Sequence, residues 1–406
     1  MKNVAVLGYG TVGSGVVEVI RRNQEVVNKK AGDKVNIKYV LDLRTFPGDP
    51  VEEILVNDFE VILNDPEVEV IAEVMGGVEP AYTFVKKALL KGKSVCTSNK
   101  ELVAKHGPEL VEIARKMKRN FFFEASVGGG IPIIRPLISS LTADEIVEVS
   151  GILNGTTNFI LTKMSKEGLD FDTVLKEAQA LGYAEKDPTA DIEGHDASRK
   201  IAILTSLVFG KTANFEEVYT EGITKITDKD FMYANKLGMS IKIFGRMKKV
   251  EKDIYAMVSP VMIDESNPLY SVNGVMNAIL VKGNVLGEAM FYGAGAGKLP
   301  TASAVVSDIV EAIKHLNDNV EIQWDAEKLV LSDIRTSEKK FFVRVAGETS
   351  KDFANIEKEF GKVVMIKLES LTDEFAFVTE KMSEADFESK IAKISNVKTR
   401  IRIEGH

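Results

Sequence analysis

The sequence predicts an α/β protein with a doubly wound parallel sheet first, an α+β domain next and a small βαββαβ unit last. Three observations lead to this prediction. Short apolar runs alternate with helical patterns over residues 1–125, which is typical of parallel strands covered by helices on both faces. The pattern then changes to longer strand-like runs. Residues 341–403 finally follow the strand and helix order of a ferredoxin-like unit.

The first domain begins with the apolar strand Val4–Leu7, a glycine turn and a helix. Further strands are predicted at residues 37–41, 70–74, 94–97 and 121–125, and helices at 81–90 and 101–118. We assign residues 1–140 to this domain, and we expect a return helix at about 301–325 to pack on it. A chain of 406 residues exceeds what one compact core usually supports, so two or three domains are expected.

The middle domain is assigned to residues 141–300. Strands of one sheet are predicted at 146–153, 255–261 and 278–292, with helices at 171–181 and 197–209. A linker is expected near 332–340, and the last domain is assigned to 339–406. Its predicted elements are a strand at 341–345, a helix at 353–360, strands at 363–369 and 375–379, a helix at 384–394 and a strand at 399–403.

Composition and charge exclude several classes of protein. With 45% hydrophobic and 28% charged residues the chain is of the ordinary globular kind. A net charge of -8 disfavours a nucleic acid or an anionic membrane as partner. No apolar run approaches the roughly 20 residues that span a bilayer. Cys96 is the only cysteine, which fits a reducing compartment and predicts a cytoplasmic location.

A glycine motif, Gly8-x-Gly10-x-x-Gly13, directly follows the first strand and opens a helix. In this context the backbone amides at the helix N-terminus can bind a pyrophosphate, so the motif predicts a dinucleotide site. The alternative is a glycine-rich turn without a ligand. The choice between cofactors stays open, because Asp42 near the end of the second strand can bind ribose hydroxyls, whereas Arg44 can pair with a 2′-phosphate. Two solvated loop charges are a third interpretation.

The stretch 181–200 is the densest charged segment before an apolar helix. Asp196 and Lys200 are four residues apart, so they share one helix face if the helix begins near Gly194. A surface ion pair is the commonest fate of such residues. The helix that follows is almost wholly apolar, however, which indicates that it is buried and that its charges point at a site.

Six blocks of the sequence, in order, resemble the blocks of homoserine dehydrogenases. These blocks are Gly8–Gly13, Thr97–Lys100, Glu124–Pro132, Gly151–Asn158, Leu181–Lys200 and Gly293–Val305. The resemblance covers about the first 320 residues. It implies an NAD- or NADP-dependent enzyme that interconverts L-aspartate 4-semialdehyde and L-homoserine, in the biosynthesis of threonine, methionine and isoleucine.

The resemblance also implies roles for individual residues. Lys200 would be the general acid, with Asp196 beside it and Lys100 as a neighbouring cation that also contacts cofactor and substrate. Substrate-binding residues would be Glu185, Asp191, Tyr183 and Lys100. Cofactor-binding residues would be Gly8, Gly10, Thr11, Val12, Gly13, Arg44, Gly76, Lys100, Gly182 and Gly297. His195 is expected to pack or to form hydrogen bonds rather than to catalyse.

Two further expectations come from the resemblance. The backbone carbonyls of Glu124, Val127, Gly129 and Ile131 would surround a sodium ion, although a glycine-rich turn that only joins domains is the alternative. The last domain resembles the ACT domain, a small amino-acid sensor and dimerising unit. Its first turn, Glu348–Phe353, lacks the usual Pro-Gly pair, which puts threonine regulation in doubt. A homodimer or homotetramer is expected.

The sequence leaves two other functions open. One is a dehydrogenase of another amino-aldehyde on the same scaffold, against which the acids Glu185, Asp191 and Asp196 argue because they suit a substrate with an ammonium group. The other is a catalytically silent nucleotide sensor that signals through its last domain. Such a sensor would have no reason to keep Lys100, Lys200 and Asp196 together.

Overall fold

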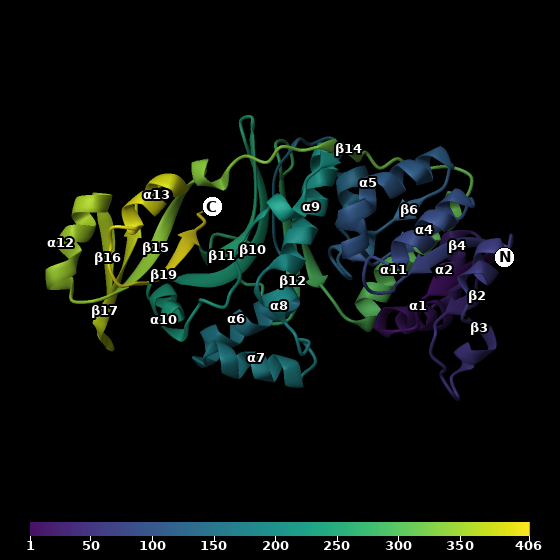
Figure 1. Ribbon diagram of the computed structural model, residues 1–406, viewed down its shortest axis with the longest axis horizontal. Coiled ribbons are helices and arrows are strands. Elements are labelled where there is room, and N and C mark those ends of the chain that lie inside the picture. Colours follow the sequence, from purple (N-terminus) through teal and green to yellow (C-terminus); the bar gives the residue numbers. More distant parts are fainter. Residues whose placement is uncertain (406) are drawn as a thin grey trace.

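The computed structural model describes residues 1–405, apart from the side chains of residues 350 and 351. His406, the last residue of the predicted C-terminal domain, lies outside the described residues, as do the side chains of Ser350 and Lys351 in its predicted first turn. The molecule is elongated, with the N-terminal sheet at one end and the C-terminal unit at the other (Figure 1). No helix of the described chain combines the length and the apolarity needed to cross a membrane.

A six-stranded sheet with strand order β3-β2-β1-β4-β5-β6 forms the first domain, and each pairing in it is parallel. Its strands are β1 (Lys2–Leu7), β2 (Val35–Leu41), β3 (Leu55–Val56), β4 (Val68–Glu73), β5 (Ser94–Thr97) and β6 (Phe121–Phe122). The connecting helices are α1 (Thr11–Arg22), α2 (Gln24–Ala31), α3 (Phe59–Asn64), α4 (Ala81–Leu90) and α5 (Lys100–Lys116). The strand order reverses between β1 and β4, where such sheets bind their ligands. The predicted doubly wound sheet is confirmed.

The predicted strand at residues 121–125 is wrong in its second half. β6 ends at Phe122, and residues 124–126 form a short 3-10 helix. The carboxylate of Glu124 accepts hydrogen bonds from the backbone N–H groups of Ile133, Ile134 and Arg135, at 2.5, 2.7 and 2.8 Å. These bonds fold the chain back on itself, which an extended strand would not allow.

Helix α11 (Lys298–Lys314) returns to the first domain and packs on α1, β4 and β5. The close approach to α1 depends on Gly15, because a Cβ atom there would lie 2.7 Å from the carbonyl oxygen of Lys298. The return helix is thus present, but it begins three residues earlier than predicted and ends at Lys314 rather than near 325.

The second sheet has eleven strands. Its main path runs β13-β12-β7-β10-β11-β19-β15-β17-β16. The strands of the middle domain are β7 (Ile146–Ile152), β10 (Met239–Val250), β11 (Asp253–Asp264), β12 (Met276–Gly283) and β13 (Gly287–Ala294). The predicted strand at 278–292 is therefore a hairpin of two strands, and β10 was not predicted at all.

The C-terminal strands continue this sheet. They are β15 (Glu338–Ala346), β16 (Val363–Leu368), β17 (Leu371–Thr379) and β19 (Val397–Ile403), with helices α12 (Thr349–Phe360) and α13 (Glu384–Ile391) between them. Their order along the chain confirms the predicted βαββαβ unit. β11 pairs in parallel with β19, so the unit is not a separate sheet. The predicted linker at 332–340 is partly wrong, since residues 334–336 form a 3-10 helix and β15 starts at Glu338.

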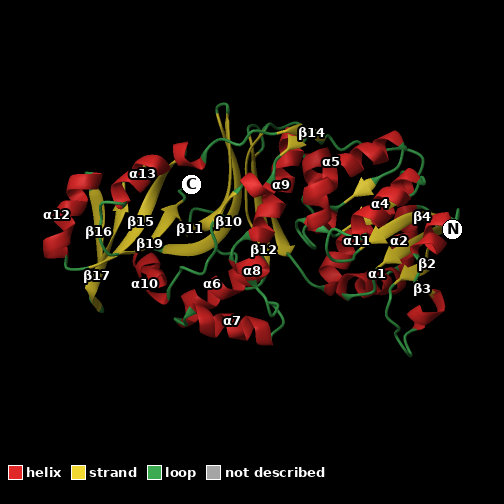
Figure 2. Ribbon diagram, viewed as in Figure 1, coloured by secondary structure: helices red, strands yellow, loops and turns green. Residues whose placement is uncertain are grey.

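Short strands complete the topology: β8 (Lys211–Thr212) pairs with β14 (Asp325–Lys328), β9 (Tyr219–Thr220) with β11, and β18 (Met382–Ser383) with β15. The middle domain contributes helices α6 (Gly155–Glu167), α7 (Phe171–Ala180), α8 (Thr189–Ile192), α9 (His195–Phe209) and α10 (Asp228–Lys236). Helices α6, α9 and α10 pack on β10. Figure 2 shows that every part of the molecule contains both helices and strands.

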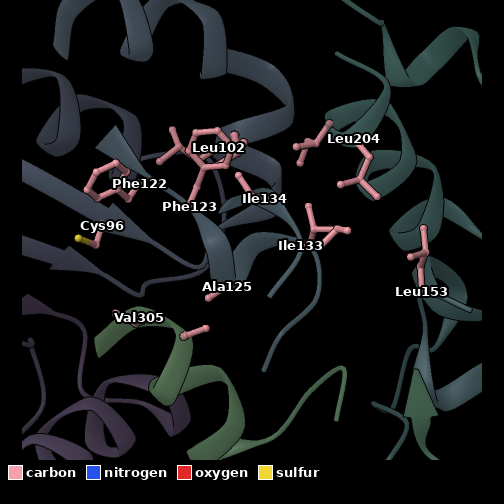
Figure 3. Close-up of a cluster of buried hydrophobic side chains, with 14 of the residues drawn as sticks. Cys96, Leu102, Phe122, Phe123, Ala125, Ile133, Ile134, Leu153, Leu204 and Val305 are labelled. Carbon is pink, nitrogen blue, oxygen red and sulfur yellow. The ribbon is translucent and has the colours of Figure 1, made fainter. Parts of the chain in front are cut away.

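The first two domains share one hydrophobic core. Figure 3 shows Ile133 and Ile134 between Phe123 on one side and Leu153 and Leu204 on the other. These side chains are buried and belong to a single cluster that spans both sheets. Helix α9 therefore lies between the large sheet and α5 (Figure 1), and the residues that α5 and α9 carry are held at fixed positions relative to one another.

Candidate active site

Helix α9 carries the first two predicted catalytic residues. Gly194 precedes the helix with a φ of +84°, and the helix begins at His195. Asp196 and Lys200 therefore share one face, and the Lys200 Nζ lies 2.7 Å from the Asp196 Oδ2. Asp196 is 2% exposed and Lys200 is 8% exposed. The predicted helix start is confirmed, and the alternative of a surface ion pair is wrong.

Lys100 reaches the same carboxylate from the other domain. It is the first residue of α5, directly after the helix cap Asn99. Its Nζ forms an ion pair with the Asp196 Oδ1, so one carboxylate lies between two ammonium groups. The side chain of Lys100 is 38% exposed, whereas that of Lys200 is 10% exposed. Asp196 thus joins a buried lysine to an open one.

Asn154 is a site residue that the sequence interpretation did not single out. Its side-chain amide donates hydrogen bonds to the Asp191 Oδ1 at 2.8 Å and to the Asp196 Oδ2 at 3.1 Å. Its amide oxygen accepts a hydrogen bond from the Thr157 N–H at 2.9 Å and so caps α6. The preceding carbonyl, that of Leu153, accepts a hydrogen bond from the Lys200 Nζ at 2.8 Å. An asparagine directly before a helix was the available signal.

The charges at this site shift each other's pKa. Burial lowers the pKa of Lys200, and the charge of Lys100 lowers it further against the attraction of Asp196. Burial would also lower the pKa of Lys100, but the Asp196 carboxylate outweighs it, so that pKa is raised. The pKa of Asp196 is lowered, because the two lysines outweigh the effect of burial. Lys200 is therefore the cation of this group that loses its proton first.

The predicted substrate-binding residues are only partly brought together. Burial, followed by the charge of Asp196, raises the pKa of Asp191, which Asn154 holds beside Asp196. Tyr183 is 44% exposed and packs edge-on against Phe159, with ring centroids 5.0 Å apart. Glu185 lies in the exposed loop between α7 and α8. Its backbone carbonyl accepts a hydrogen bond from the side-chain amide of Gln179 at 3.1 Å.

The glycine motif has the shape that a dinucleotide needs. Gly8 has a φ of +97°, and a Cβ atom on Gly13 would overlap the carbonyl oxygen of Gly8. A Cβ atom on Gly10 would meet nothing within 4 Å, so the space in front of α1 is open. No side chain of the described chain caps α1, which leaves the first amides, at Thr11 and Val12, without a side-chain acceptor. These observations fit a pyrophosphate at the helix N-terminus.

Two of the other predicted cofactor residues lie near this motif. Gly76 is exposed and follows Met75, whose side chain would be 3.1 Å from a Cβ atom on Gly8. Gly297, with a φ of +116°, precedes α11, and α11 packs on α1. Gly182 has a φ of +74° and lies in an exposed turn after α7.

Asp42 and Arg44 bind each other at the end of β2. The Arg44 Nε donates to the Asp42 Oδ1 at 2.9 Å, and its Nη2 donates to the Oδ2 at 2.8 Å. The Tyr9 N–H also donates to the Oδ2, at 2.8 Å, which ties Asp42 to the glycine motif. The hydrogen bonds from Arg44 hold the pKa of Asp42 well below its usual range. The two residues that could discriminate between cofactors therefore form one unit.

The loop of the predicted cation site packs against the loop before α11. A Cβ atom on Gly129 would overlap the carbonyl oxygen of Gly295, and Gly129 has a φ of +58°. The loop's own backbone hydrogen bonds are accepted by the carbonyls of Phe123, Gly128 and Ala294. The predicted ligands, the carbonyls of Glu124, Val127, Gly129 and Ile131, are outside these particular bonds.

Known proteins resemble this chain over its whole length. A family model described as homoserine dehydrogenase matches residues 132–310, and one described as homoserine dehydrogenase, NAD binding domain, matches residues 8–124. The homoserine dehydrogenase of Bacillus subtilis is 40% identical over 428 aligned residues, covering 99% of this chain and 98% of that protein. The solved homoserine dehydrogenase of Thiobacillus denitrificans has a TM-score of 0.91 and 38% identity, covering 100% of this chain and 98% of that chain. A hyperthermophilic archaeal homoserine dehydrogenase, solved in complex with NADPH, has a TM-score of 0.66 and 30% identity, covering 77% of this chain and 98% of that chain.

Proposed function

The chain belongs to the homoserine dehydrogenase family of NAD(P)-dependent oxidoreductases, and from this premise we propose how its own residues carry out the reaction. The reaction interconverts L-aspartate 4-semialdehyde and L-homoserine. The nicotinamide, when bound, donates or accepts the hydride at C4 of the substrate. The remaining work belongs to the protein: it binds the amino-acid end of the substrate, positions C4 and moves one proton at the C4 oxygen.

Lys200 moves that proton. The observation that carries this assignment is the burial of its ammonium group against Asp196 with Lys100 as a neighbouring cation. As an acid, Lys200 protonates the oxygen that becomes the homoserine hydroxyl, and its charge stabilises the developing oxyanion. As a base in the reverse direction it must be neutral, and the lowered pKa of Lys200 favours that form. Asp196 orients the ammonium and does not itself transfer the proton.

The amino-acid end of the substrate lies beside α8 in this proposal. Asp191 and Glu185 bind the substrate ammonium, and the more exposed Lys100 binds a negatively charged group of the substrate or the cofactor. Tyr183, two residues before Glu185, contacts the substrate from the same loop. The support for Asp191 is its hydrogen-bonded position next to the catalytic pair, and the support for Lys100 is its partial exposure beside Asp196.

We propose that the cofactor extends from the glycine motif toward Lys200. Gly8, Gly10, Thr11, Val12 and Gly13 hold its pyrophosphate, and Gly76, Gly182 and Gly297 allow its close approach to the backbone. Arg44 pairs with the 2′-phosphate of NADP, whereas Asp42 binds the ribose hydroxyls of NAD. Arg44 binds Asp42 through Nε and Nη2, so its Nη1 remains for a phosphate while the pair stays intact.

Several broader properties are also proposed. Sodium is held by the carbonyls of Glu124, Val127, Gly129 and Ile131, which the bonding of that loop leaves outside its own hydrogen bonds. The domains are residues 1–140 with α11, then 141–300, then an ACT-like unit at 339–406. The subunits form a homodimer or homotetramer, which the edge strand β13 supports by exposing Met290 and Tyr292. The enzyme serves threonine, methionine and isoleucine biosynthesis in the cytoplasm, with threonine as the effector to be tested.

The experiment is the oxidation of NADH and of NADPH by the purified protein with L-aspartate 4-semialdehyde, with and without threonine. Rapid oxidation ranks the two cofactors, and inhibition by threonine identifies it as the effector. Lys200→Ala is expected to lower kcat by roughly two to four powers of ten with little change in cofactor affinity, because it removes a positioned general acid. An unchanged kcat would remove Lys200 from the mechanism.

A further inference from the structure

One arginine of the C-terminal unit reaches into the middle domain. Arg402 lies on β19 and is 6% exposed. Its Nε and Nη2 donate to the two carboxylate oxygens of Glu384 at 2.7 and 2.8 Å, within the C-terminal unit. Its remaining nitrogen, Nη1, donates to the Oε2 of Glu221 at 2.7 Å. Glu384 thus holds the guanidinium in place while the guanidinium holds Glu221.

Glu221 belongs to a strap, residues 219–223, that runs between the C-terminal unit and helix α8. The strap begins as β9, which pairs with β11, and the N–H of Glu221 donates to the carbonyl of Val258 at 2.8 Å. The guanidinium of Arg402 also lies over the ring of Tyr219, 5.0 Å from its centroid. One face of the strap is therefore fixed by the large sheet and by Arg402.

The other face of the strap touches the end of α8. The N–H of Ile223 donates to the carbonyl of Ile192 at 2.8 Å. Gly222 fits so closely that a Cβ atom on it would overlap the carbonyl oxygen of Ile192 and lie 2.6 Å from the Cα of Glu193. Ile192 directly follows Asp191, and Asn154 bonds Asp191 together with Asp196. A continuous series of contacts therefore connects Arg402 to Asp191, the carboxylate proposed to bind the substrate ammonium.

We propose that Arg402 is a positioning residue for substrate binding: through Glu221 and Gly222 it sets the place of α8, and with it the place of the Asp191 carboxylate that receives the substrate ammonium. This inference rests on the proposed role of Asp191. It makes the C-terminal unit part of the substrate site, although none of its residues touches the substrate. It also predicts that KM for homoserine responds to the strap, whereas cofactor binding does not.

Gly222→Ala is the sharpest test. The φ of Gly222 is not in the left-handed region, so alanine can adopt the backbone conformation and the variant acts only by pushing the strap away from α8. We expect KM for homoserine to rise roughly 3- to 10-fold, with kcat and the KM for the nicotinamide cofactor changed less than about twofold. Glu221→Ala should act in the same direction. Glu221→Gln should have a KM close to that of the wild type, because the glutamine amide oxygen still accepts the hydrogen bond from Arg402.

Lys229→Ala is the matched control. Lys229, on α10, pairs with Glu374 of β17 at 3.0 Å and so also joins the catalytic domain to the C-terminal unit at a partly exposed position. It should leave KM for homoserine unchanged. An equal rise in Lys229→Ala and Glu221→Ala would overturn the proposal, since any loosening of the two units would then suffice. So would an unchanged KM in Gly222→Ala.

Asp191→Asn, measured in parallel, separates this inference from the proposed function. A raised KM for homoserine in Asp191→Asn with no change in Gly222→Ala and Glu221→Ala would overturn the positioning role and keep the role of Asp191. An unchanged KM in Asp191→Asn would overturn both, because Arg402 would then have no carboxylate to position.

Discussion

Lys100 and Lys200 share one carboxylate but differ in their access to water. The Lys200 side chain is 10% exposed. Because little water can solvate its charge, burial lowers the pKa of Lys200. The Lys100 side chain is 38% exposed, and the charge of Asp196 raises its pKa. The pKa values of the two lysines are therefore shifted in opposite directions, which fits the proposed proton transfer by Lys200 beside a Lys100 that stays charged.

The lowered pKa of Lys200 gives the two directions of the reaction opposite pH dependence. In the proposed mechanism homoserine oxidation needs neutral Lys200, so its rate should rise as the pH rises through that pKa, and the rate of semialdehyde reduction should fall over the same range. Lys100→Met removes a cation that lowers the pKa of Lys200. We expect the alkaline limb of kcat/KM for reduction to move to higher pH in this variant, whatever the loss in absolute rate.

The measurement is a full pH profile of kcat/KM for reduction in the wild-type enzyme and in Lys100→Met. Lys105→Met, a change of another α5 lysine outside the cluster, serves as the control and should leave the profile in place. A limb that stays in place or moves to lower pH in Lys100→Met would show that Lys100 does not act on the titrating group.

At the scale of single elements, Asn154 combines two functions. Its oxygen caps α6, and its amide joins Asp191 to Asp196. Asn154→Ser keeps a good cap but is too short to bridge the carboxylates, so we expect a higher KM for homoserine at nearly unchanged stability. Asn154→Ala loses both functions and should in addition lose about 1 kcal/mol of unfolding free energy. Urea unfolding and steady-state kinetics on both variants would expose the error if the serine variant kept the wild-type KM.

A buried carboxyl group joins two strands of the first sheet. Glu73, at the end of β4, accepts a hydrogen bond from the hydroxyl of Thr97 on β5 at 2.5 Å and one from the N–H of Met75 at 2.8 Å. Burial raises the pKa of Glu73 to about 7, against the effect of these hydrogen bonds. The folded protein therefore holds this proton at pH values where the unfolded chain has released it.

The sign of the resulting effect on stability follows directly. Between the ordinary value of 4.5 and about 7 the folded state binds more protons than the unfolded state, so the free energy of unfolding falls as the pH rises. Glu73→Gln should remove about 1–3 kcal/mol of this decline. Urea titrations at about pH 5 and about pH 8 measure it. Equal pH slopes in variant and wild type would mean that Glu73 does not titrate in this range.

At the scale of the whole molecule, the C-terminal unit is joined to the middle domain by a continuous sheet and by buried charges. Arg344 on β15 donates to the Asp230 Oδ1 of α10 at 2.9 Å and to the carboxylate of Glu374 at 3.2 and 3.3 Å. Asp230 and Glu374 are 0% and 6% exposed. Asp230 depends on Arg344 for charge compensation, whereas Glu374 also pairs with Lys229 at 3.0 Å.

Arg344→Met is expected to lower the free energy of unfolding by about 3–5 kcal/mol, because it leaves the buried Asp230 carboxylate without its cation. Arg344→Met combined with Asp230→Asn should recover part of that loss, since one of the uncompensated charges is removed. Chemical unfolding of the two variants tests this. A double variant less stable than the single variant would contradict this account, because it would show that a neutral amide at position 230 of α10 costs more than the uncompensated charge.

Features that depend on neighbouring residues were predictable. The order of strands and helices in the first sheet, the βαββαβ unit and the shared face of Asp196 and Lys200 follow from periodicity and from glycine positions, which local sterics determine. β10 is not predicted from the sequence although it is central, and the strand prediction at 278–292 does not locate the turn between β12 and β13. β10 is buried over most of its length and lacks a clean alternation of apolar and polar residues, so its limits are not marked in the sequence.

By itself the sequence determined the fold class and the family, because both depend on short stretches whose spacing is meaningful without the rest of the chain, and it predicted the residues proposed for the site. Only the tertiary structure decided which distant groups meet. Lys100 of the first domain reaches Asp196 of the middle domain, and β19 pairs with β11 in the eleven-stranded sheet. Arg402 binds Glu221, which is 181 residues away along the chain. Such pairings depend on how buried faces pack and how charges are compensated in three dimensions, and no local period records them.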